Sequence, residues 1–409
     1  MGLCKAALAG EPSTLSVLST GARWTPDFPD PGRCLATAKR SARPPRRWLV
    51  ARSHALLPST DLGIGLGERE SMNFENVSIV SVRHVHAPHR VTSAEIQNRL
   101  ADTMQRLGVQ HDLLEAVAGI KARRFWDEGF KPSDAATLAA RAVLDETGLD
   151  PAQIGILINT SVCRDYIEPS TACFVHNHLN LPATCTNMDV GNACLAFFNG
   201  MEIVGNMIER GQIDYGLIVD GESSRFLTES TIARLQRPST DMKAFREEFA
   251  SLTTGSGAVA MLLGRSDLNP DGHRFKGTVS LAATEHNRLC LGQVDQGWTD
   301  TRGLLIAGVD LSNRTWTKAC EELGFSESDV DHYCLHQVSH VHAHQLASTL
   351  GVDINKALLI VSEFGNIGPA SVPIVLSMAS DEGRIKQGDR VVLAGIGSGI
   401  NCMVGEVIW

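Results

Sequence analysis

The stretch of sequence that decides the fold is DVGNACLAF, at residues 189–197. A Gly-Asn pair, which is typical of a turn, precedes Cys194. After the cysteine, apolar side chains recur every three or four positions, which is helical rather than strand spacing. The pattern predicts a helix from about Leu195 to Arg210, ended by Gly211, with Cys194 at its start.

Cys194 has a physical reason to be reactive at that position. The first N–H groups of a helix lack intrahelical partners and carry partial positive charge, so they favour a thiolate. We therefore predict a lowered pKa for the Cys194 thiol and a role as a nucleophile. The alternative is a small core residue, and we interpret the other cysteines from Cys163 onward in that way.

The composition of the 409-residue chain is that of a globular protein, with 43% hydrophobic and 20% charged residues. The net charge of −9 argues against a nucleic-acid-binding protein, which would carry a basic surface. No apolar stretch reaches the roughly 18 residues that a transmembrane helix needs. The 10 cysteines include no C-x-x-C pair, so the sequence predicts no zinc site and no disulfide framework, and it indicates a cytoplasmic protein.

Residues 1–71 differ in character from the rest of the chain. They are net basic, whereas residues 72–409 are net acidic, and the segment 32–53 holds basic residues and no acidic one. Such a composition does not pack into a core. We interpret residues 1–71 as a disordered extension or as the product of a translation start placed too far upstream, with Met72 as the true first residue. A transit peptide is the alternative.

The remaining sequence alternates short apolar runs with helical patterns, which predicts an α/β fold. Ile154–Ile158 is one such run, typical of a strand buried on both faces of a sheet. The order of elements around the Gly-Asn pair at 191–192 recurs around the pair at 365–366. We therefore predict an internal duplication, with one half at residues 72–265 and the other at 266–409.

Three elements within this pattern matter below. Ser133 is predicted to cap a helix from Asp134 to about Thr147, ended by Gly148. The apolar run Ala357–Val361 is predicted to be a strand that leads to the second Gly-Asn pair. Residues 225–254 are more polar and are interpreted as a helical insertion.

Cys194, His336 and Asn366 each fall at or just beyond the predicted end of a buried strand, where open α/β sheets bind ligands. A thiol, an imidazole and a carboxamide at one place suit acyl transfer. The thiol forms a thioester, and the N–H groups of the other two side chains stabilise an oxyanion or an enolate. The alternatives are a satisfied core histidine at His336 and a left-handed turn residue at Asn366.

Gly397, Ser398 and Gly399 follow the predicted strand Arg390–Ala394. Glycines at such a place allow the backbone to approach a ligand closely. We predict that a backbone N–H of this segment, together with that of Cys194, binds a substrate oxyanion.

Several motifs of the chain resemble those of the thiolase superfamily, in particular its ketoacyl synthase III-like branch with a Cys-His-Asn triad. They are DVGNACLAF at 189–197, LHQVS at 335–339, FGNIGPASVP at 364–373 and GIGSGIN at 395–401. Two further motifs resemble the acyl-CoA condensing enzymes of bacterial long-chain olefin biosynthesis, namely GIKARRFW at 119–126 and RDYIEPSTA at 164–172.

The resemblance implies a thiolase-like fold, in which two α/β halves stack into five alternating layers of helix and sheet. It implies a Claisen condensation of two long-chain fatty acyl-CoA molecules to a β-ketoacyl-CoA or β-keto acid without decarboxylation. Cys194 would carry the acyl group, and His336 and Asn366 would stabilise the enolate. Glu168 would remove the α-proton of the second acyl chain and would reach the site from a partner subunit.

The same resemblance implies a homodimer that uses coenzyme A thioesters as substrates, has no other cofactor and supplies later enzymes of olefin synthesis. His336 and His340 have the spacing of metal ligands on a helix, but no carboxylate accompanies them at ligand spacing. We therefore predict no metal site. We assign no role to His340, His342 and His344.

Other functions stay open at this point. A ketoacyl synthase III-type enzyme would use malonyl-carrier protein and form its carbanion by loss of CO₂, so it would not need Glu168 as a base. A hydroxymethylglutaryl-CoA synthase-like enzyme also pairs Cys, His and Glu, but its usual motifs are not evident. A non-catalytic scaffold of the same fold would not be acylated at Cys194.

Overall fold

The computed structural model describes residues 72–409, and its largest element is a ten-stranded mixed sheet. The predictions for residues 1–71 lie outside the described residues. The strands of the sheet are β1 (Met72–Asn73), β2 (Val77–His86), β5 (Ile154–Asn159), β6 (Thr186–Asp189), β7 (Tyr215–Glu222), β8 (Gly257–Arg265), β9 (His273–Ala282), β12 (His332–Leu335), β13 (Arg390–Gly397) and β14 (Asn401–Ile408). Two small sheets pair β3 (His89–Thr92) with β4 (Ala122–Phe125), and β10 (Cys290–Gly292) with β11 (Gly297–Thr299).

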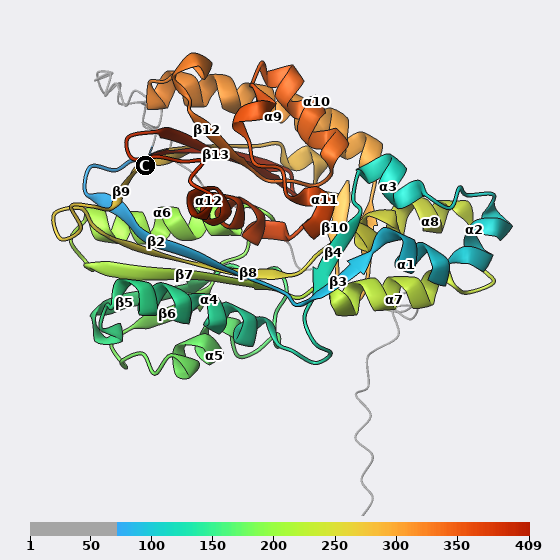
Figure 1. The fold of residues 1–409 in the computed structure, drawn as a ribbon, viewed down its shortest axis with the longest axis horizontal. Coiled ribbons are helices and arrows are strands. Elements are labelled where there is room, and N and C mark those ends of the chain that lie inside the picture. The colour runs from blue at the N-terminus through green and yellow to red at the C-terminus, as the bar shows by residue number, and fades with distance from the viewer. Residues whose placement is uncertain (1–71) are drawn as a thin grey trace, which may run out of the picture. The chain divides into compact units, whose positions relative to one another are not determined.

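Helices form the outer and the middle layers of the structure. They are α1 (Ser93–Arg99), α2 (Ala101–Leu107), α3 (Leu113–Ala118), α4 (Pro132–Thr147), α5 (Thr171–His178), α6 (Ala196–Glu209), α7 (Arg225–Leu235), α8 (Met242–Glu248), α9 (Thr301–Leu323), α10 (His340–Leu350), α11 (Val361–Phe364) and α12 (Ser371–Asp381). Helices α4 and α5 cover one part of the sheet, α9 and α10 cover the other, and α6 and α12 lie between the two parts (Figure 1). No helix within residues 72–409 is long and apolar enough to cross a membrane.

The two parts of the sheet repeat one topology. In the first, β5 is parallel to both β6 and β7, and antiparallel β8 and β2 follow β7. In the second, β12 is parallel to β13, antiparallel β14 and β9 follow, and a single bridge from Ala357 to Tyr333 takes the place of β6. The parts join where Ser78 and Ile79 of β2 pair with Arg274 and His273 of β9. This topology confirms the predicted duplicated α/β fold with five layers.

The largest hydrophobic core lies around the two middle helices. Helix α6 contributes Phe197 and Phe198, and α12 contributes Ile374 and Val375, all buried against strands of both sheet parts. The apolar spacing that predicted a helix at 195–210 therefore corresponds to α6, which is one residue shorter at each end. Burial from both sides explains why few polar side chains interrupt that spacing.

Helix α4 begins earlier than the sequence predicted. It starts at Pro132 instead of Asp134, because the fixed φ of proline suits the first helical position. Ser133 therefore lies inside the helix and not at its cap. Its hydroxyl and N–H donate to the carboxylate of Asp165, at 2.5 and 2.9 Å, and tie α4 to the loop before α5.

Residues 357–361 do not form the predicted strand, and only the first of them bridges to β12. The buried side chain of Gln337 takes the place of a neighbouring strand. Its Nε2 donates to the carbonyl of Leu358 at 2.8 Å. Its Oε1 accepts the N–H groups of Ile360 at 2.8 Å and of Val361 at 3.0 Å. One carbonyl and two N–H groups of this segment are thus satisfied without a strand partner.

Residues 225–254 are helical, as predicted, and form α7 and α8. They share a separate apolar core with α1, α2 and α3, in which Ile96, Met104 and Leu114 pack with Ile232 and Phe245. This helical region lies beside the layered body (Figure 1).

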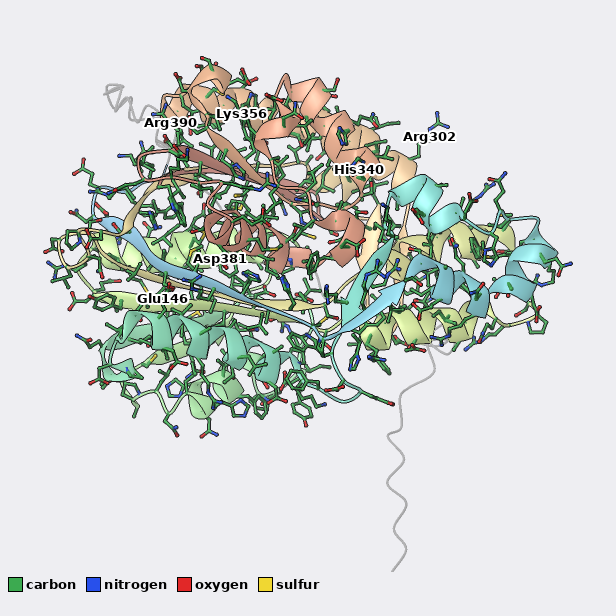
Figure 2. The ribbon with its side chains drawn as sticks, in the orientation of Figure 1. Glu146, Arg302, His340, Lys356, Asp381 and Arg390 are labelled. Atoms are coloured by element: carbon green, nitrogen blue, oxygen red, sulfur yellow. The ribbon has the colours of Figure 1, made fainter. Side chains whose placement is uncertain are left out.

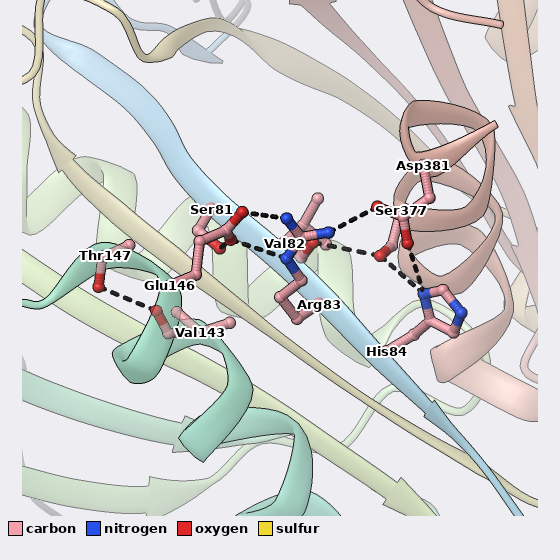
Figure 3. A network of polar contacts seen from close by, with 9 residues as sticks. All are labelled: Ser81, Val82, Arg83, His84, Val143, Glu146, Thr147, Ser377 and Asp381. Atoms are coloured by element: carbon pink, nitrogen blue, oxygen red, sulfur yellow. Dashed lines mark hydrogen bonds and ion pairs between the residues drawn. The ribbon is translucent and has the colours of Figure 1, made fainter. Parts of the chain in front are cut away.

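A polar network joins α4, β2 and α12 (Figure 3). Arg83 of β2 forms ion pairs with Glu146 of α4 and with Asp381 of α12. Next to it, Nδ1 of His84 lies 2.8 Å from the hydroxyl of Ser377. Figure 2 shows Glu146 and Asp381 on either side of β2, so the network links an outer and a middle layer across an interior strand of the sheet.

Candidate active site

Cys194 lies in a tight turn between β6 and α6. The N–H of Leu195 donates to the carbonyl of Asn192 at 3.0 Å. The left-handed residue of the turn is Ala193, with φ of +46°, although a glycine and an asparagine, which adopt this conformation more easily, precede it. A strained residue of this kind persists only where the surroundings hold it.

A chain of polar side chains supports the turn. Asn401 of β14 donates to Oδ1 of Asn192 at 3.1 Å, and Asn192 donates to Asn199 at 2.8 Å. Asn199 in turn donates to Glu202 of α6 at 2.9 Å. These supporting contacts were not predicted from the sequence. A signal was present, because two polar residues three positions apart interrupt the apolar pattern of α6.

The prediction of a lowered pKa for Cys194 is wrong. Burial, followed by the nearby Cys290 and Glu222, raises the pKa of the thiol to about 12. These neighbours come from other strands, and the order of residues around Cys194 does not reveal them. The resting site therefore holds a neutral thiol.

His336 directly follows β12, and its backbone N–H donates to the carbonyl of Ala394 at 2.8 Å. The ring is buried, and neither ring nitrogen has a hydrogen-bond partner in the part of the chain that the structure describes. Burial, with a smaller contribution from His342, lowers the pKa of the imidazole to about 3. The ring is therefore neutral, with one donor and one acceptor unused. Leaving such groups buried without partners costs about 1–3 kcal/mol each, which marks a place for a ligand.

Two glycines of β13 let the Cys194 turn and His336 approach the same strand. A Cβ on Gly395 would lie 3.4 Å from the Cβ of His336 and 2.9 Å from the side chain of Leu195. A Cβ on Gly397 would lie 3.4 Å from the backbone nitrogen of Cys194. Strand β13 thus brings these two predicted site residues to one place.

Ser398 and Gly399 form the turn between β13 and β14. Gly399 has φ of +138°, a conformation that side chains rarely adopt. Ser398 is half-buried. The hydrogen bond from Asn401 to Asn192 holds this turn beside the Cys194 turn. The segment lies where the sequence predicted an oxyanion-binding backbone, and that role stays a prediction.

Asn366 lies just beyond α11, and its backbone bridges to Thr254. Its Oδ1 accepts the N–H of Gly368 at 2.9 Å, which fixes the orientation of the carboxamide and leaves Nδ2 to donate to a ligand. A Cβ on Gly368 would lie 3.6 Å from the carboxyl carbon of Glu222. Because Glu222 also acts on the thiol of Cys194, the Asn366 turn belongs to the same site.

Two buried carboxyl groups at the end of β7 were not singled out from the sequence. Asp220 is 0% and Glu222 is 4% exposed. Glu222 accepts the N–H groups of Val162 at 2.6 Å and of Cys163 at 3.3 Å, and Asp220 accepts the hydroxyl of Thr160 at 2.7 Å. Burial raises the pKa of both carboxyls, and the nearby Glu222 raises that of Asp220 further. Acidic residues at the carboxyl end of an apolar strand were the signal that could have found them.

Glu168 is the one predicted catalytic residue that a single chain leaves apart from the others. It lies in the loop between β5 and α5 and is exposed. Its neighbours Tyr166 and Ile167 are 53% and 95% exposed. The loop therefore presents a carboxylate beside apolar side chains to the outside of the chain.

The histidines after His336 do not form a metal centre with it. Helix α10 begins at His340, so His336 and His340 do not share a helix. A Cβ on Gly119 would lie 2.5 Å from the Cβ of His340, which therefore packs against the end of α3 (Figure 2). Within residues 72–409, no group of three or more His, Cys, Asp or Glu side chains could hold a metal ion.

Comparison with known sequences identifies several relatives. The family model "3-oxoacyl-[acyl-carrier-protein] synthase III C terminal" matches residues 320–407. The acyl-CoA:acyl-CoA alkyltransferase of Xanthomonas campestris is 50% identical over 338 residues, which are 83% of this chain and 100% of that protein. The enzyme of the same name from Shewanella oneidensis is 36% identical over 350 residues, 83% of this chain and 100% of that protein. A β-ketoacyl-[acyl-carrier-protein] synthase III of Neisseria meningitidis is 26% identical over 309 residues, 73% of this chain and 90% of that protein.

Solved structures agree with the sequence comparison. Cerulenin-bound OleA of Xanthomonas campestris, which is 50% identical, superimposes with a TM-score of 0.82 over 83% of this chain and 98% of that one. A cysteine-to-serine variant of the same protein, with bound lauric acid and lauroyl-CoA, gives a TM-score of 0.81 at 50% identity over 82% of this chain and 100% of that one. The chain therefore belongs to the acyl-CoA:acyl-CoA alkyltransferase (OleA) family, within the ketoacyl synthase III-like branch of the thiolase superfamily.

Proposed function

We propose that this chain condenses two long-chain fatty acyl-CoA molecules head to head, without decarboxylation. One observation carries the proposal. A thiol and a neutral imidazole with unused ring nitrogens meet at β13, and the turn that holds an oriented carboxamide lies beside Glu222, in a member of a family named for a reaction between two acyl-CoA molecules.

In the first half-reaction, Cys194 attacks the carbonyl carbon of one acyl-CoA. The thiol proton passes to the neutral imidazole of His336, and the departing CoA sulfur takes that proton as its bond to carbon breaks. An acyl-Cys194 thioester and free coenzyme A result. Backbone N–H groups of Cys194 and of the segment Gly397–Gly399 stabilise the oxyanion.

In the second half-reaction, the carboxylate of Glu168 removes the α-proton of a second acyl-CoA. The N–H of His336 and Nδ2 of Asn366 hold the enolate oxygen. The α-carbon attacks the acyl-Cys194 carbonyl, and Cys194 leaves as a thiolate that regains the proton from Glu168. The product is a β-ketoacyl-CoA, which hydrolysis converts to the β-keto acid. These steps balance with coenzyme A thioesters alone, without another cofactor.

In this proposal Glu168 acts at the site of a partner subunit. Tyr166 and Ile167 expose apolar surface beside it, and a second copy of the chain would bury that surface. In such a homodimer, each subunit supplies its Glu168 carboxylate to the Cys194 site of the other subunit. The free cysteines of residues 72–409 support a reducing cytoplasm, where the product would supply later enzymes of olefin synthesis.

A small apolar cavity of about 30 Å³ lies beside His336, between α9, α10 and the second sheet part. A long alkyl chain would enter here only if these apolar walls moved apart. The walls of the cavity include Trp316, Leu335, Leu346, Leu350, Val352, Ile396 and Val404.

A decarboxylating synthase III is the second candidate, because the family model and the Neisseria relative are of that kind. Such an enzyme gains its carbanion from malonyl-carrier protein and needs no base at Glu168. Replacement of Glu168 by Gln therefore separates the two functions. Loss of condensation supports the proposed reaction, and near-normal condensation removes the assignment of the base.

The decisive experiment uses one long-chain acyl-CoA and no malonyl donor. We expect release of free coenzyme A and a β-keto product, or the ketone that its decarboxylation gives, with nearly twice the carbon number of the substrate, detected by mass spectrometry. Release of the parent fatty acid alone would show that Cys194 is acylated without a competent second step. That result would favour the malonyl-dependent alternative.

A further inference from the structure

The loop that carries Glu168 is anchored at its first end by Glu222. The two carboxyl oxygens of Glu222 accept the N–H groups of Val162 and Cys163, at 2.6 and 3.3 Å. Glu222 is buried at the end of β7 and acts on the thiol of Cys194. The start of the loop is therefore fixed to the framework of the nucleophile site.

The second end of the loop is anchored by Asp189, the last residue of β6 and the first of the DVGNAC stretch. Its Oδ2 accepts the N–H of Thr171 at 2.9 Å, and its Oδ1 accepts that of Ala172 at 2.8 Å. These two N–H groups open α5, so Asp189 caps that helix from a different strand. Asn159 of β5 donates to the same carboxylate at 3.1 Å and orients it.

Asp165 fixes a third point of the loop, between the two anchors. Asp165 accepts two hydrogen bonds from Ser133 of α4, and its own N–H donates to the hydroxyl of Thr171 at 3.2 Å. These bonds leave residues 166–169 as a short exposed tip on a fixed base. Glu168 lies in that tip.

We propose that Glu222 and Asp189 are positioning residues, which hold the two ends of the Glu168 loop and so determine where the Glu168 carboxylate stands for proton abstraction. The inference rests on the proposed function, in which Glu168 is the base. Both anchors belong to strand ends that also build the chain's own Cys194 site. The base that one subunit offers its partner is therefore placed by the framework of the first subunit's own nucleophile.

A carboxylate is needed at each anchor because each accepts two backbone N–H groups at once. A carboxamide of the same shape has one oxygen, and its NH₂ group would face the second N–H. Glu222→Gln or Asp189→Asn should therefore loosen one end of the loop while the fold is kept. A small displacement of a reacting group lowers a rate by as much as about a hundredfold, so we expect condensation to fall by roughly ten- to a hundredfold.

The test separates the two half-reactions. Acylation of Cys194 is followed by quenched-flow mass spectrometry of the intact protein, and condensation by the appearance of the β-keto product. For Asp189→Asn we expect acylation to stay within about threefold of the wild type while condensation falls. Glu222→Gln also removes a charge that raises the pKa of the Cys194 thiol, so for this variant we expect acylation at least as fast as in the wild type while condensation falls. A fold defect would lower both.

Asp150→Asn provides a matched control. Asp150 also caps a short helical turn, by accepting the N–H of Ala152 at 2.9 Å, but it is exposed and precedes β5 at the end opposite the site. We expect neither half-reaction to change in this variant. A loss of condensation as large as in Asp189→Asn would overturn the inference, because loss of any carboxylate cap would then be sufficient.

A double-mutant cycle shows whether the anchors act through Glu168. In a Glu168→Gln background the base is absent, so Asp189→Asn or Glu222→Gln should lower the residual condensation no further. A further loss of condensation as large as the loss in the single anchor variant would overturn the inference. An equal loss of acylation and condensation in the single variants would overturn it as well.

The same set of proteins keeps this inference distinct from the proposed function. The wild-type product and the single variant Glu168→Gln test the function. If the wild type makes no product of nearly doubled length, the function fails. If the wild type makes this product but Glu168→Gln keeps full condensation, the assignment of Glu168 as the base fails. The inference then fails with it. If both behave as proposed, the anchor variants alone decide the inference.

Discussion

At the scale of single residues, the neutral state of Cys194 and His336 governs how the resting site behaves. Burial holds the thiol pKa near 12 and the imidazole pKa near 3, so proton transfer from sulfur to nitrogen is unfavourable. In the proposed reaction an acyl-CoA changes this balance, because its developing oxyanion receives hydrogen bonds from the site. On this proposal the thiolate of Cys194 forms only when an acyl group is in place.

Alkylation by iodoacetamide at pH 7.5 should modify Cys173 well before Cys194. Cys173 is exposed, whereas the pKa of Cys194 leaves only about one thiol in 10⁴–10⁵ as thiolate at that pH. Peptide mass spectrometry over time measures both rates. The rate at Cys194 should still increase above pH 9, and a plateau below pH 8 would contradict the raised pKa.

Asn366→Ala should impair condensation far more than acylation. The carboxamide is held by Gly368 so that Nδ2 faces the site, and removing one such donor lowers a rate by about a hundredfold or more. The two half-reactions are measured as above. Asn98→Ala, at an exposed position of α1, is the control and should change neither. Equal loss of both half-reactions would show that Asn366 serves the fold instead.

At the scale of elements, the segment after β12 shows how one side chain replaces a strand. Gln337 satisfies one carbonyl and two N–H groups of residues 358–361. It directly follows His336 beyond the end of β12. An element that the apolar pattern predicts as a strand thus becomes an irregular segment that leads into α11.

Gln337→Leu should destabilise the protein by about 2–4 kcal/mol, because buried backbone groups would lose their partners at a cost of about 1–3 kcal/mol each. Denaturant unfolding measures the change. Gln345→Leu on an exposed face of α10 is the control and should change the free energy of unfolding by less than about 0.5 kcal/mol. A small effect of Gln337→Leu would mean that water replaces the lost hydrogen bonds.

The elements with a clear local period could be predicted from the sequence. Helix α6, strand β5 and the duplication follow from apolar spacing and from the repeated Gly-Asn pair. The convergence of Cys194 and His336 also follows, because both lie at strand ends of a repeated α/β unit. These features depend on residues that are close in sequence, or on the general rule that sites in α/β sheets lie at the ends of the strands.

What the sequence did not predict depends on contacts between distant residues. The pKa of Cys194 depends on groups such as Glu222 from β7, and the loss of the strand at 357–361 depends on the side chain of Gln337. The anchoring of the Glu168 loop depends on β6 and β7 together. No local period encodes such pairings.

At the scale of the whole molecule, the two halves meet at histidines that are kept neutral. The ring of His86 in β2 packs against that of Phe364 in α11, with centroids 4.6 Å apart and planes tilted by 39°, and so joins the first half to the second. Burial, with the nearby His84 and Arg124, lowers the pKa of His86 to about 4. The pKa of His84 is lowered as well, mainly by burial.

These histidines should make the protein less stable in acid. A histidine whose pKa is lower in the folded state binds protons more readily when unfolded, so its contribution to stability is complete above about pH 6.5 and is lost as the pH falls toward 4. Buried carboxyls with a raised pKa, such as Glu222, change the stability with pH in the opposite direction. The test therefore compares two proteins that share these carboxyls and differ only at His86. The difference in unfolding free energy between wild type and His86→Gln should shrink as the pH falls from 7 to about 4.5. A constant difference would contradict the lowered pKa.

The strand order also determines when the molecule can be completed during synthesis. Strand β9 lies in the interior of the sheet, between β2 and β14, but β14 is made only after α9, α10, α11 and α12 have left the ribosome. Until then one edge of β9 has no partner, and an open edge invites pairing with other nascent chains. The second half therefore cannot close its sheet until β14, the last strand of the chain, has been made.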